Sequence, residues 1–198
     1  MSHSFQSRLS MWMVALSASA LVWSASAQTA STAVSPVTLT AVSDVKALDD
    51  GLQIQAGPGQ IQITALRDDI VRVRVSPGAT LPEDASWAVL PEPRTKHIHV
   101  QTTQDAASVG FKTAALDVRV ERNPLRLVVR DLAGNVICAD AMGRPTEFNR
   151  GGFTVSKEMP GDEHFYGLGD KIGTFDRRDQ AYTLWNTDIG PQEATDPI

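Results

Sequence analysis

The sequence predicts an all-β protein, an antiparallel β-sandwich preceded by a signal peptide. Three observations predict the sandwich. Apolar and polar residues alternate with a period of two in several short segments, which is the pattern of strands with one buried face. Turn-forming residues separate these segments, and no window of about 12 residues has the spacing of an amphipathic helix. With 42% hydrophobic residues, the chain has enough apolar side chains for a core.

Residues 1–27 have the composition of a secretory signal peptide. Arg8 is the only strongly basic residue before an apolar run over residues 11–23, which contains no acidic residue. Ala25 and Ala27 follow as an A-x-A-like site, so we expect cleavage after Ala27. The alternative is an uncleaved anchor, but the apolar run is short for a bilayer span. The sequence thus predicts export, to a bacterial periplasm, the cell surface or the medium, with no membrane span after cleavage.

The mature chain is expected to begin with a flexible lead-in over residues 28–44, whose first part is small and polar. Residues 45–185 are then expected to form the sandwich. Its first hairpin pairs residues 60–64 with residues 71–75, where valines alternate with arginines. The charged stretch at residues 67–69 supplies the turn.

A second hairpin is predicted from residues 116–120 and 125–129, which alternate in the same way on either side of Asn123-Pro124. The proline-rich stretch from Leu81 to Arg94 is interpreted as a loop that crosses between the sheets. Further short strands are expected at residues 136–139, 153–155 and 164–166.

Charge and cysteine content argue against several functions. The formal net charge is −5 and no run of basic residues occurs, so nucleic acid is not an expected partner.

The single cysteine, Cys138, cannot form an internal disulfide, and its apolar neighbours predict a buried strand position. His97 and His99 are expected at alternate positions of one exposed strand face, and two histidines without a third ligand make no metal site. We expect no metal and no cofactor.

Arginines recur at alternate strand positions, and this pattern has two interpretations. They are either an anion-binding site or the solvated faces of the strands, and the second is the simpler interpretation. The residues concerned are Arg72, Arg74, Arg119, Arg126 and Arg130.

The segment near the C-terminus is the most informative. Gly167-Leu168-Gly169 permits a sharp bend with positive φ at the glycines, but without a third glycine and a βαβ setting it is no phosphate loop. Trp185, Asn186 and Asp188 follow. An aromatic ring covers the apolar face of a pyranose, and amide and carboxylate groups hydrogen-bond its hydroxyls. The alternative is that Trp185 is a core residue and that Asn186 and Asp188 cap a turn.

A family resemblance bears on this choice. Residues 165–171, Phe-Tyr-Gly-Leu-Gly-Asp-Lys, are followed by Tyr182-Thr183 and then by Trp185-Asn186-Thr187-Asp188. This order and spacing resemble the end of the N-terminal domain of family 31 glycoside hydrolases, the α-glucosidase and α-xylosidase group. There a Y-G-L-G-E-K-like turn precedes a Y-x-x-W-N-T-D-like loop. Asp170 departs mildly from this pattern, because many members have Glu there. The strong match covers residues 163–197, and a weaker one covers most of the mature chain.

The resemblance implies a galactose-mutarotase-like β-sandwich followed by a (β/α)₈ barrel. The barrel of such enzymes carries a nucleophilic aspartate, in a W-x-D-M-x-E-like motif, and an acid/base aspartate, which together hydrolyse α-glycosides with retention. These 198 residues contain no such motif, so we do not expect the chain by itself to be catalytic.

Residues 186–198 are expected to be a substrate loop and the start of a linker to the barrel. By position in the motif, Asp188 is the sugar-binding candidate, and Asn186 and Trp185 shape its loop. The implied partners are an α-linked oligosaccharide and the barrel.

Two other functions remain open from the sequence. One is a stand-alone carbohydrate-binding sandwich, and the other is a structural module without a ligand. A catalytic pair chosen from Asp176, Asp179 and Asp188 is less simple than the alternative, in which all three are solvated loop carboxylates.

Overall fold

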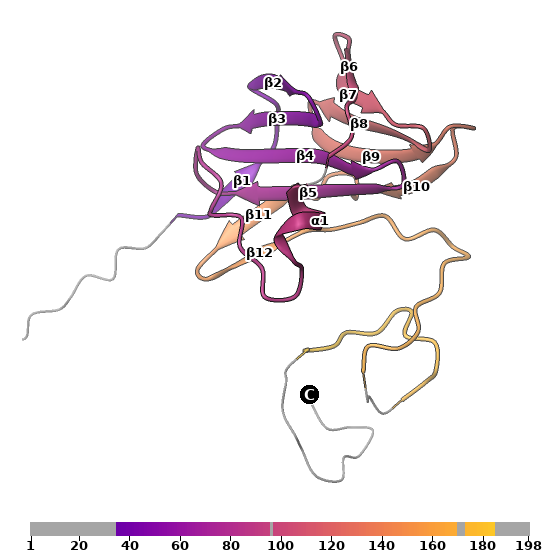
Figure 1. Cartoon of the computed structure of the whole chain (residues 1–198). Coiled ribbons are helices and arrows are strands. Elements are labelled where there is room, and N and C mark those ends of the chain that lie inside the picture. The colour runs from indigo at the N-terminus through magenta and orange to yellow at the C-terminus, as the bar shows by residue number, and fades with distance from the viewer. Residues whose placement is uncertain (1–34, 96, 170–172, 185–198) are drawn as a thin grey trace, which may run out of the picture. The chain divides into compact units, whose positions relative to one another are not determined.

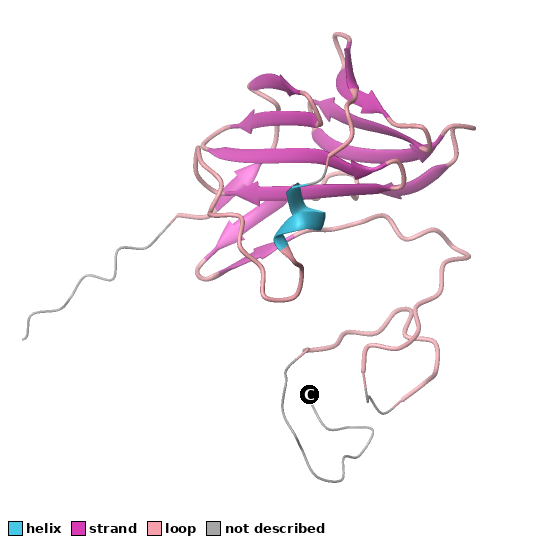
Figure 2. Cartoon of the chain, viewed as in Figure 1, coloured by secondary structure: helices cyan, strands magenta, loops and turns pink. Residues whose placement is uncertain are grey.

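The alternating segments form antiparallel sheets in the computed structural model, which describes residues 35–95, 97–169 and 173–184. Figures 1 and 2 show strands up to residue 154, one short helix beside them, and loop over the described residues that follow. In chain order the elements are β1 Val37–Leu39, β2 Asp44–Leu48, β3 Gly51–Ala56, β4 Gly59–Arg67, β5 Ile70–Ser76, α1 Pro91–Thr95, β6 Gln101–Gln104, β7 Ser108–Lys112, β8 Leu116–Arg122, β9 Leu125–Asp131, β10 Val136–Ala139, β11 Thr146–Asn149 and β12 Gly152–Thr154.

Two larger sheets and one smaller sheet contain these strands. The order is β2-β3-β4-β5 in one larger sheet, β10-β9-β8-β7-β6 in the other, and β1-β11-β12 in the smaller. Both predicted hairpins are confirmed: β4 pairs with β5 around Ile63 and Val73, and β8 pairs with β9 around Val118 and Val129. The prediction of an all-β antiparallel sandwich is therefore confirmed.

The core lies between the two larger sheets, where β3 contacts β6 and β7. Ile54 and Phe111 are fully buried, as are most of the apolar residues at alternate positions of β3, β4, β7 and β8. Backbone hydrogen bonds outside the ladders also join the sheets, including one of 2.9 Å from the Val42 N–H to the Arg122 carbonyl. Burial on alternate positions follows from the pleat, which directs successive side chains to opposite faces.

The expected lead-in over residues 28–44 is wrong in its last part. Val37–Leu39 forms β1, which pairs with β11, and Leu39 is fully buried against the core. The Leu125 N–H also donates to the Thr40 carbonyl at 2.7 Å. These residues are ordered because β11, more than 100 residues later in the chain, supplies their hydrogen-bond partners.

The C-terminal bound of the expected sandwich, residue 185, also needs correction. The last strand of the described residues, β12, ends at Thr154, and it confirms the strand expected at residues 153–155. The strand expected at residues 164–166 is wrong. Its backbone is held by the Asp176 side chain and by a 2.7 Å bond from the Arg177 N–H to the Phe165 carbonyl, so loop contacts replace a ladder.

Cys138 lies on a strand as expected, but the prediction of burial is wrong. β10 is an edge strand that pairs with β9, and its first three residues are exposed. His97 and His99 are both exposed, but they precede β6 and lie outside the strands. The stretch from Leu81 to Arg94 is mostly loop, as expected, although its last residues belong to α1.

Within the described residues, no helix is long and apolar enough to cross a bilayer, and no three metal-ligating side chains gather. Among the arginines at alternate strand positions, Arg126 departs from the expected solvated face, whereas the Arg119 side chain, for example, is 42% exposed. The Arg126 side chain is only 13% exposed and lies 2.7 Å from Glu158 and 3.3 Å from Glu121. The other four arginines bond to Asp84 (Arg72), to the Pro82 carbonyl (Arg74), to Asp117 (Arg119) and to the Gly134 carbonyl (Arg130).

Candidate functional site

The three predicted sugar-binding residues, Trp185, Asn186 and Asp188, lie outside the described residues. Asp170 in the preceding turn also lies outside them. The structure does describe residues 163–169 and 173–184, which carry residues 165–169 and Tyr182-Thr183 of the motif and lead directly to the predicted loop.

The expected bend at the glycines is confirmed. Gly167 and Gly169 have φ angles of 90° and 84°. Leu168 between them has a φ of 68°, a region in which an L-residue with a branched side chain is strained. Three successive residues in the left-handed region turn the chain sharply, which explains why glycine stands on both sides of Leu168.

Asp176 organises the segment that follows this bend. One carboxylate oxygen lies 2.5 Å from the Nδ1 atom of His164, and the other accepts the backbone N–H of Arg178 at 3.0 Å. The second oxygen also accepts the Phe165 N–H at 3.4 Å. The Asp176 carboxylate therefore ties residues 164–165 to residues 176–178.

The electrostatics of Asp176 match this role. The Arg178 N–H, followed by the His164 side chain, lowers the pKa of Asp176 below its ordinary value of 3.8. Asp179 differs, because its side chain is 78% exposed and lies 3.8 Å from Arg178. Both are therefore loop carboxylates in contact with solvent, as expected, since the Asp176 side chain is also 37% exposed, but Asp176 in addition braces the loop.

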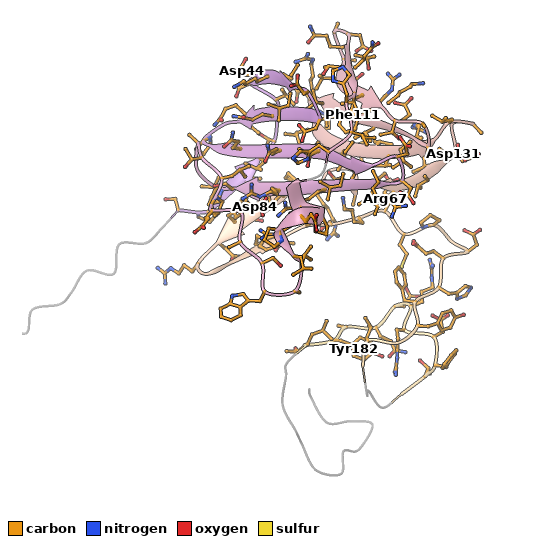
Figure 3. All side chains as sticks on the ribbon, in the orientation of Figure 1. Asp44, Arg67, Asp84, Phe111, Asp131 and Tyr182 are labelled. Carbon is orange, nitrogen blue, oxygen red and sulfur yellow. The ribbon has the colours of Figure 1, made fainter. Side chains whose placement is uncertain are left out.

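Aromatic rings gather on the same segment. The ring centroids of Tyr166 and Phe175 are 4.9 Å apart, and those of His164 and Tyr166 are 6.3 Å apart. The Arg177 guanidinium lies 5.5 Å from the Tyr182 ring centre and donates to its hydroxyl at 3.2 Å. Phe175 remains 81% exposed. This segment, which begins at His164 and ends at Tyr182 (labelled in Figure 3), places exposed rings beside the predicted sugar loop in the sequence.

Sequence reasoning missed the pair of His164 and Asp176, and it missed Phe175. No spacing rule links a histidine to an aspartate twelve residues later in a loop, so the pair carried no signal. An isolated phenylalanine in the charged stretch at residues 174–179 was a usable signal, because an apolar ring among polar residues needs a partner.

We predict that acid releases this brace. The pKa of Asp176 is lower in the folded segment than in the unfolded chain, so its contacts are present above about pH 4 and are lost as pH falls through the lower, folded value. Asp176→Asn should therefore weaken protection of the Phe165 and Arg178 amides against hydrogen exchange at pH 6. Asp179→Asn is the matched control and should leave both amides unchanged. Equal protection in both variants would contradict the role of Asp176.

The comparisons with known proteins agree on one family. The sequence model of the glycosyl hydrolase 31 N-terminal galactose mutarotase-like domain matches residues 60–198. An enzyme named α-glucosidase 2, from Bacillus thermoamyloliquefaciens, is 31% identical over 142 residues. That alignment covers 71% of this chain and 18% of the enzyme.

Solved structures of this family have the same fold. A GH31 dextranase from Flavobacterium johnsoniae, solved with isomaltotriose, superposes with a TM-score of 0.71 at 21% identity, over 81% of this chain and 20% of the dextranase. A GH31 α-xylosidase from Xanthomonas citri superposes with a TM-score of 0.57 at 16% identity, over 69% of this chain and 16% of the xylosidase. The chain thus spans about a fifth, or less, of the length of these relatives.

Proposed function

This chain belongs to the glycosyl hydrolase 31 family as its N-terminal galactose mutarotase-like domain, and we propose that it serves an exported, retaining α-glycosidase by supplying a substrate loop. The observation that carries the proposal is the extent of the family match, which includes the whole motif up to Asp188. In the proposal, Asp188 hydrogen-bonds the sugar hydroxyls, and Asn186 and Trp185 shape the loop around the ring.

The described part of the motif supports this role of the loop. The chain enters the loop from a segment tied down by Asp176 and by the contact of Arg177 with Tyr182. A loop that binds sugar needs a rigid base, because each side chain that binding must immobilise weakens affinity.

An open apolar groove supports packing against a following barrel. The groove has a volume of about 410 Å³, is lined by residues of β3, β4, β5, β8, β9, β11 and β12, and reaches the core residues Ile54 and Ile63. Val73 on β5 is 44% exposed there, and Phe153 on β12 is 64% exposed. Exposed apolar surfaces of this kind are typical of interfaces between domains. We place the barrel contact on this groove.

The two catalytic carboxylates are assigned to the barrel. Retention requires a nucleophile and an acid/base group about 5 Å apart on either side of the scissile bond. Within the described residues of the motif, Asp176 is occupied by His164 and two backbone amides, so it is not available to attack a sugar. Export is assigned to residues 1–27, which would be removed on secretion.

The test uses the polypeptide encoded by the complete gene, read past the codon for Ile198. The secreted enzyme should begin at Gln28 by mass spectrometry and hydrolyse α-glycosides with retention. Asp188→Ala should lower kcat/KM about tenfold to a hundredfold, the expected cost of a lost hydrogen bond to a charged group. Asp179→Ala is the control and should retain activity. A frame without a second domain, or equal kinetics for both variants, would count against the proposal.

A further inference from the structure

The free edge of β5 borders the apolar groove. β5 is the last strand of its sheet, so no described strand pairs with its other side. Its pairing with β4 is regular from Val71 to Ser76, which makes the edge an uninterrupted row of backbone groups. The three edge valines, Val71, Val73 and Val75, line the groove with their side chains.

The edge valines direct their backbone groups away from β4. On β4, the Ala65 N–H donates at 2.8 Å to the carbonyl of Asp50, next to β3, so the groups of Ala65 point away from β5. Direction alternates along an antiparallel strand, so the groups of Thr64 point to β5, where Thr64 pairs with Arg72. The edge valines, which alternate with Arg72, therefore present their N–H and C=O groups at the free edge. Within the described residues, no backbone hydrogen bond outside the ladders reaches them.

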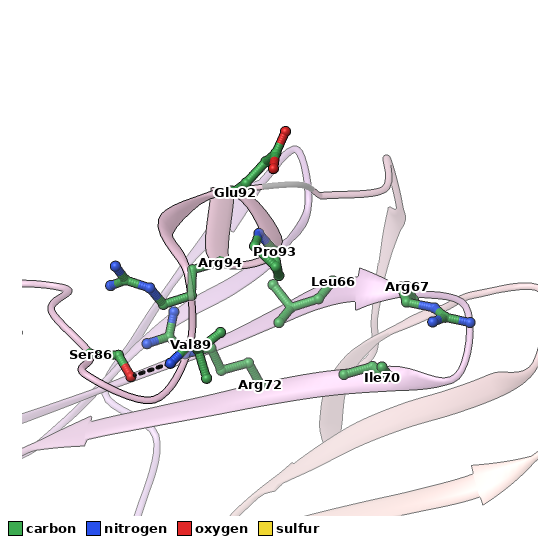
Figure 4. Close-up of a pocket in the computed structure, with 9 residues that line it drawn as sticks. All are labelled: Leu66, Arg67, Ile70, Arg72, Ser86, Val89, Glu92, Pro93 and Arg94. Carbon is green, nitrogen blue, oxygen red and sulfur yellow. Dashed lines mark hydrogen bonds between the residues drawn. The ribbon is translucent and has the colours of Figure 1, made fainter.

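The loop before α1 occupies the outer face of β5, which leaves the edge and the inner face open. Both terminal nitrogens of Arg72 donate to the Asp84 carboxylate of this loop, at 2.7 and 2.8 Å. Figure 4 shows this outer side, where Val89 from the loop and Pro93 from α1 line a hollow together with Ile70. On the inner face, in contrast, Val73 is 44% exposed. Any further partner of β5 therefore binds at its edge and in the groove.

The groove offers apolar surface and no unpaired charge. Its two charged residues, Asp140 and Lys157, lie 2.5 Å apart and neutralise each other. Apart from these two and Thr146, the lining is apolar, and it reaches the core residues Ile54 and Ile63. Apolar side chains that fill the groove would remove this part of the core from water and stabilise the domain.

A β-strand satisfies the edge and the groove together. The row of N–H and C=O groups pairs with an extended backbone, whereas a helix has already bonded its own backbone groups internally. Residues of an added strand that lie opposite the edge valines share their face and enter the groove, so alternate residues of that strand are apolar. We propose that a strand of the domain that follows in the complete polypeptide pairs with β5 in this way.

The length of the relatives favours a strand from the same polypeptide. This chain spans about a fifth, or less, of their length, so a following domain has ample sequence to supply the strand. A tethered strand also pairs at a high effective concentration, whereas a second copy of the chain is recruited from solution. The inference rests on the proposed function for the existence of the following domain, and it specifies their contact as strand pairing along β5.

Hydrogen exchange at single-residue resolution tests the pairing, with the 198-residue chain compared with the polypeptide encoded by the complete gene. The amides of the edge valines should exchange at least about a hundredfold more slowly in the complete polypeptide, because each donates to the added strand. The amides of Arg72 and Arg74 are the internal control. They belong to the ladder with β4 and should be protected in both proteins.

Val73→Pro tests whether protection comes from pairing at the edge. Proline removes an N–H that faces the free edge and leaves the bonds of β5 to β4 in place. In the complete polypeptide it should lower the protection of the Val71 and Val75 amides about tenfold or more. Val73→Asp, which places a charge in the groove, should have the same effect. Val136→Asp is the matched control on the edge strand β10, where the valine is 48% exposed, and should leave the protection within about twofold.

Thermal melting of the 198-residue chain verifies that each variant folds, and Val73→Asp replaces Val73→Pro if the proline variant does not. Equally fast exchange of the edge valines in both proteins would overturn the inference. Protection already present in the 198-residue chain would also overturn it: a segment of this chain covers the edge if that protection is independent of concentration, and a second copy covers it if protection rises with concentration. If Asp188→Ala lowers kcat/KM while the edge valines stay unprotected, this inference alone fails. A reading frame without a second domain would end both proposals.

Discussion

Replacing Phe111 with alanine is expected to lower the free energy of unfolding by about 4 kcal/mol. Phe111 lies on β7, opposite Val118 of β8, and its side chain is fully buried in the core (labelled in Figure 3). The loss combines the transfer of an aromatic ring to water with the cavity that remains between the two sheets. The strands cannot close this cavity, because backbone hydrogen bonds on both sides fix their spacing.

Phe175→Ala is the matched control, because the same side chain is 81% exposed there. Its loss should change the free energy of unfolding by less than about 0.5 kcal/mol. Urea unfolding followed by circular dichroism measures both values. If the two variants lose similar stability, then Phe111 is not at the centre of the core.

Gly51→Ala is expected to cost about 3 kcal/mol or more, although it adds a single methyl group. A Cβ atom at this position would lie 1.9 Å from the carbonyl oxygen of Ile63 and 2.9 Å from its carbonyl carbon. These atoms belong to the backbone of β4, which is paired on both sides, so they cannot move as a flexible side chain does. The methyl group therefore forces two strands apart.

Gly78→Ala is the control for the change from glycine to alanine. A Cβ atom there has nothing within 4 Å, and Gly78 is not among the residues with positive φ. Its stability should stay within about 0.5 kcal/mol of the parent, with a small gain because alanine restricts the unfolded chain. A similar loss at both positions would show that the clash at Gly51 is not the cause.

Much of the sheet structure was predictable because hairpins are local. The alternation on either side of residues 67–69 identified β4 and β5, and Asn123-Pro124 marked the turn between β8 and β9. β1 was missed for the opposite reason. A strand of three residues is too short to show an alternation of apolar and polar side chains. β1 forms because β11 pairs with it from a distant part of the chain.

The features of the candidate site also fall into two groups: those that residue type predicts and those that depend on contacts with distant residues. The positive φ angles at Gly167 and Gly169 followed from residue type, since glycine alone adopts them without strain. The brace at Asp176 could not be predicted from residue type, because the sequence of a loop does not show whether a carboxylate faces water or a backbone amide.

By itself the sequence determined the fold class, the two hairpins and the family, because alternation and turn chemistry depend on neighbouring residues. Tertiary structure alone decided burial at the sheet edges and the partners of the charged groups. Cys138 has an apolar setting yet is exposed on β10, and Arg126 alternates like a solvated residue yet is held between Glu121 and Glu158. In both cases the outcome depends on which distant strand or loop covers the residue, and a local pattern carries no information about that cover.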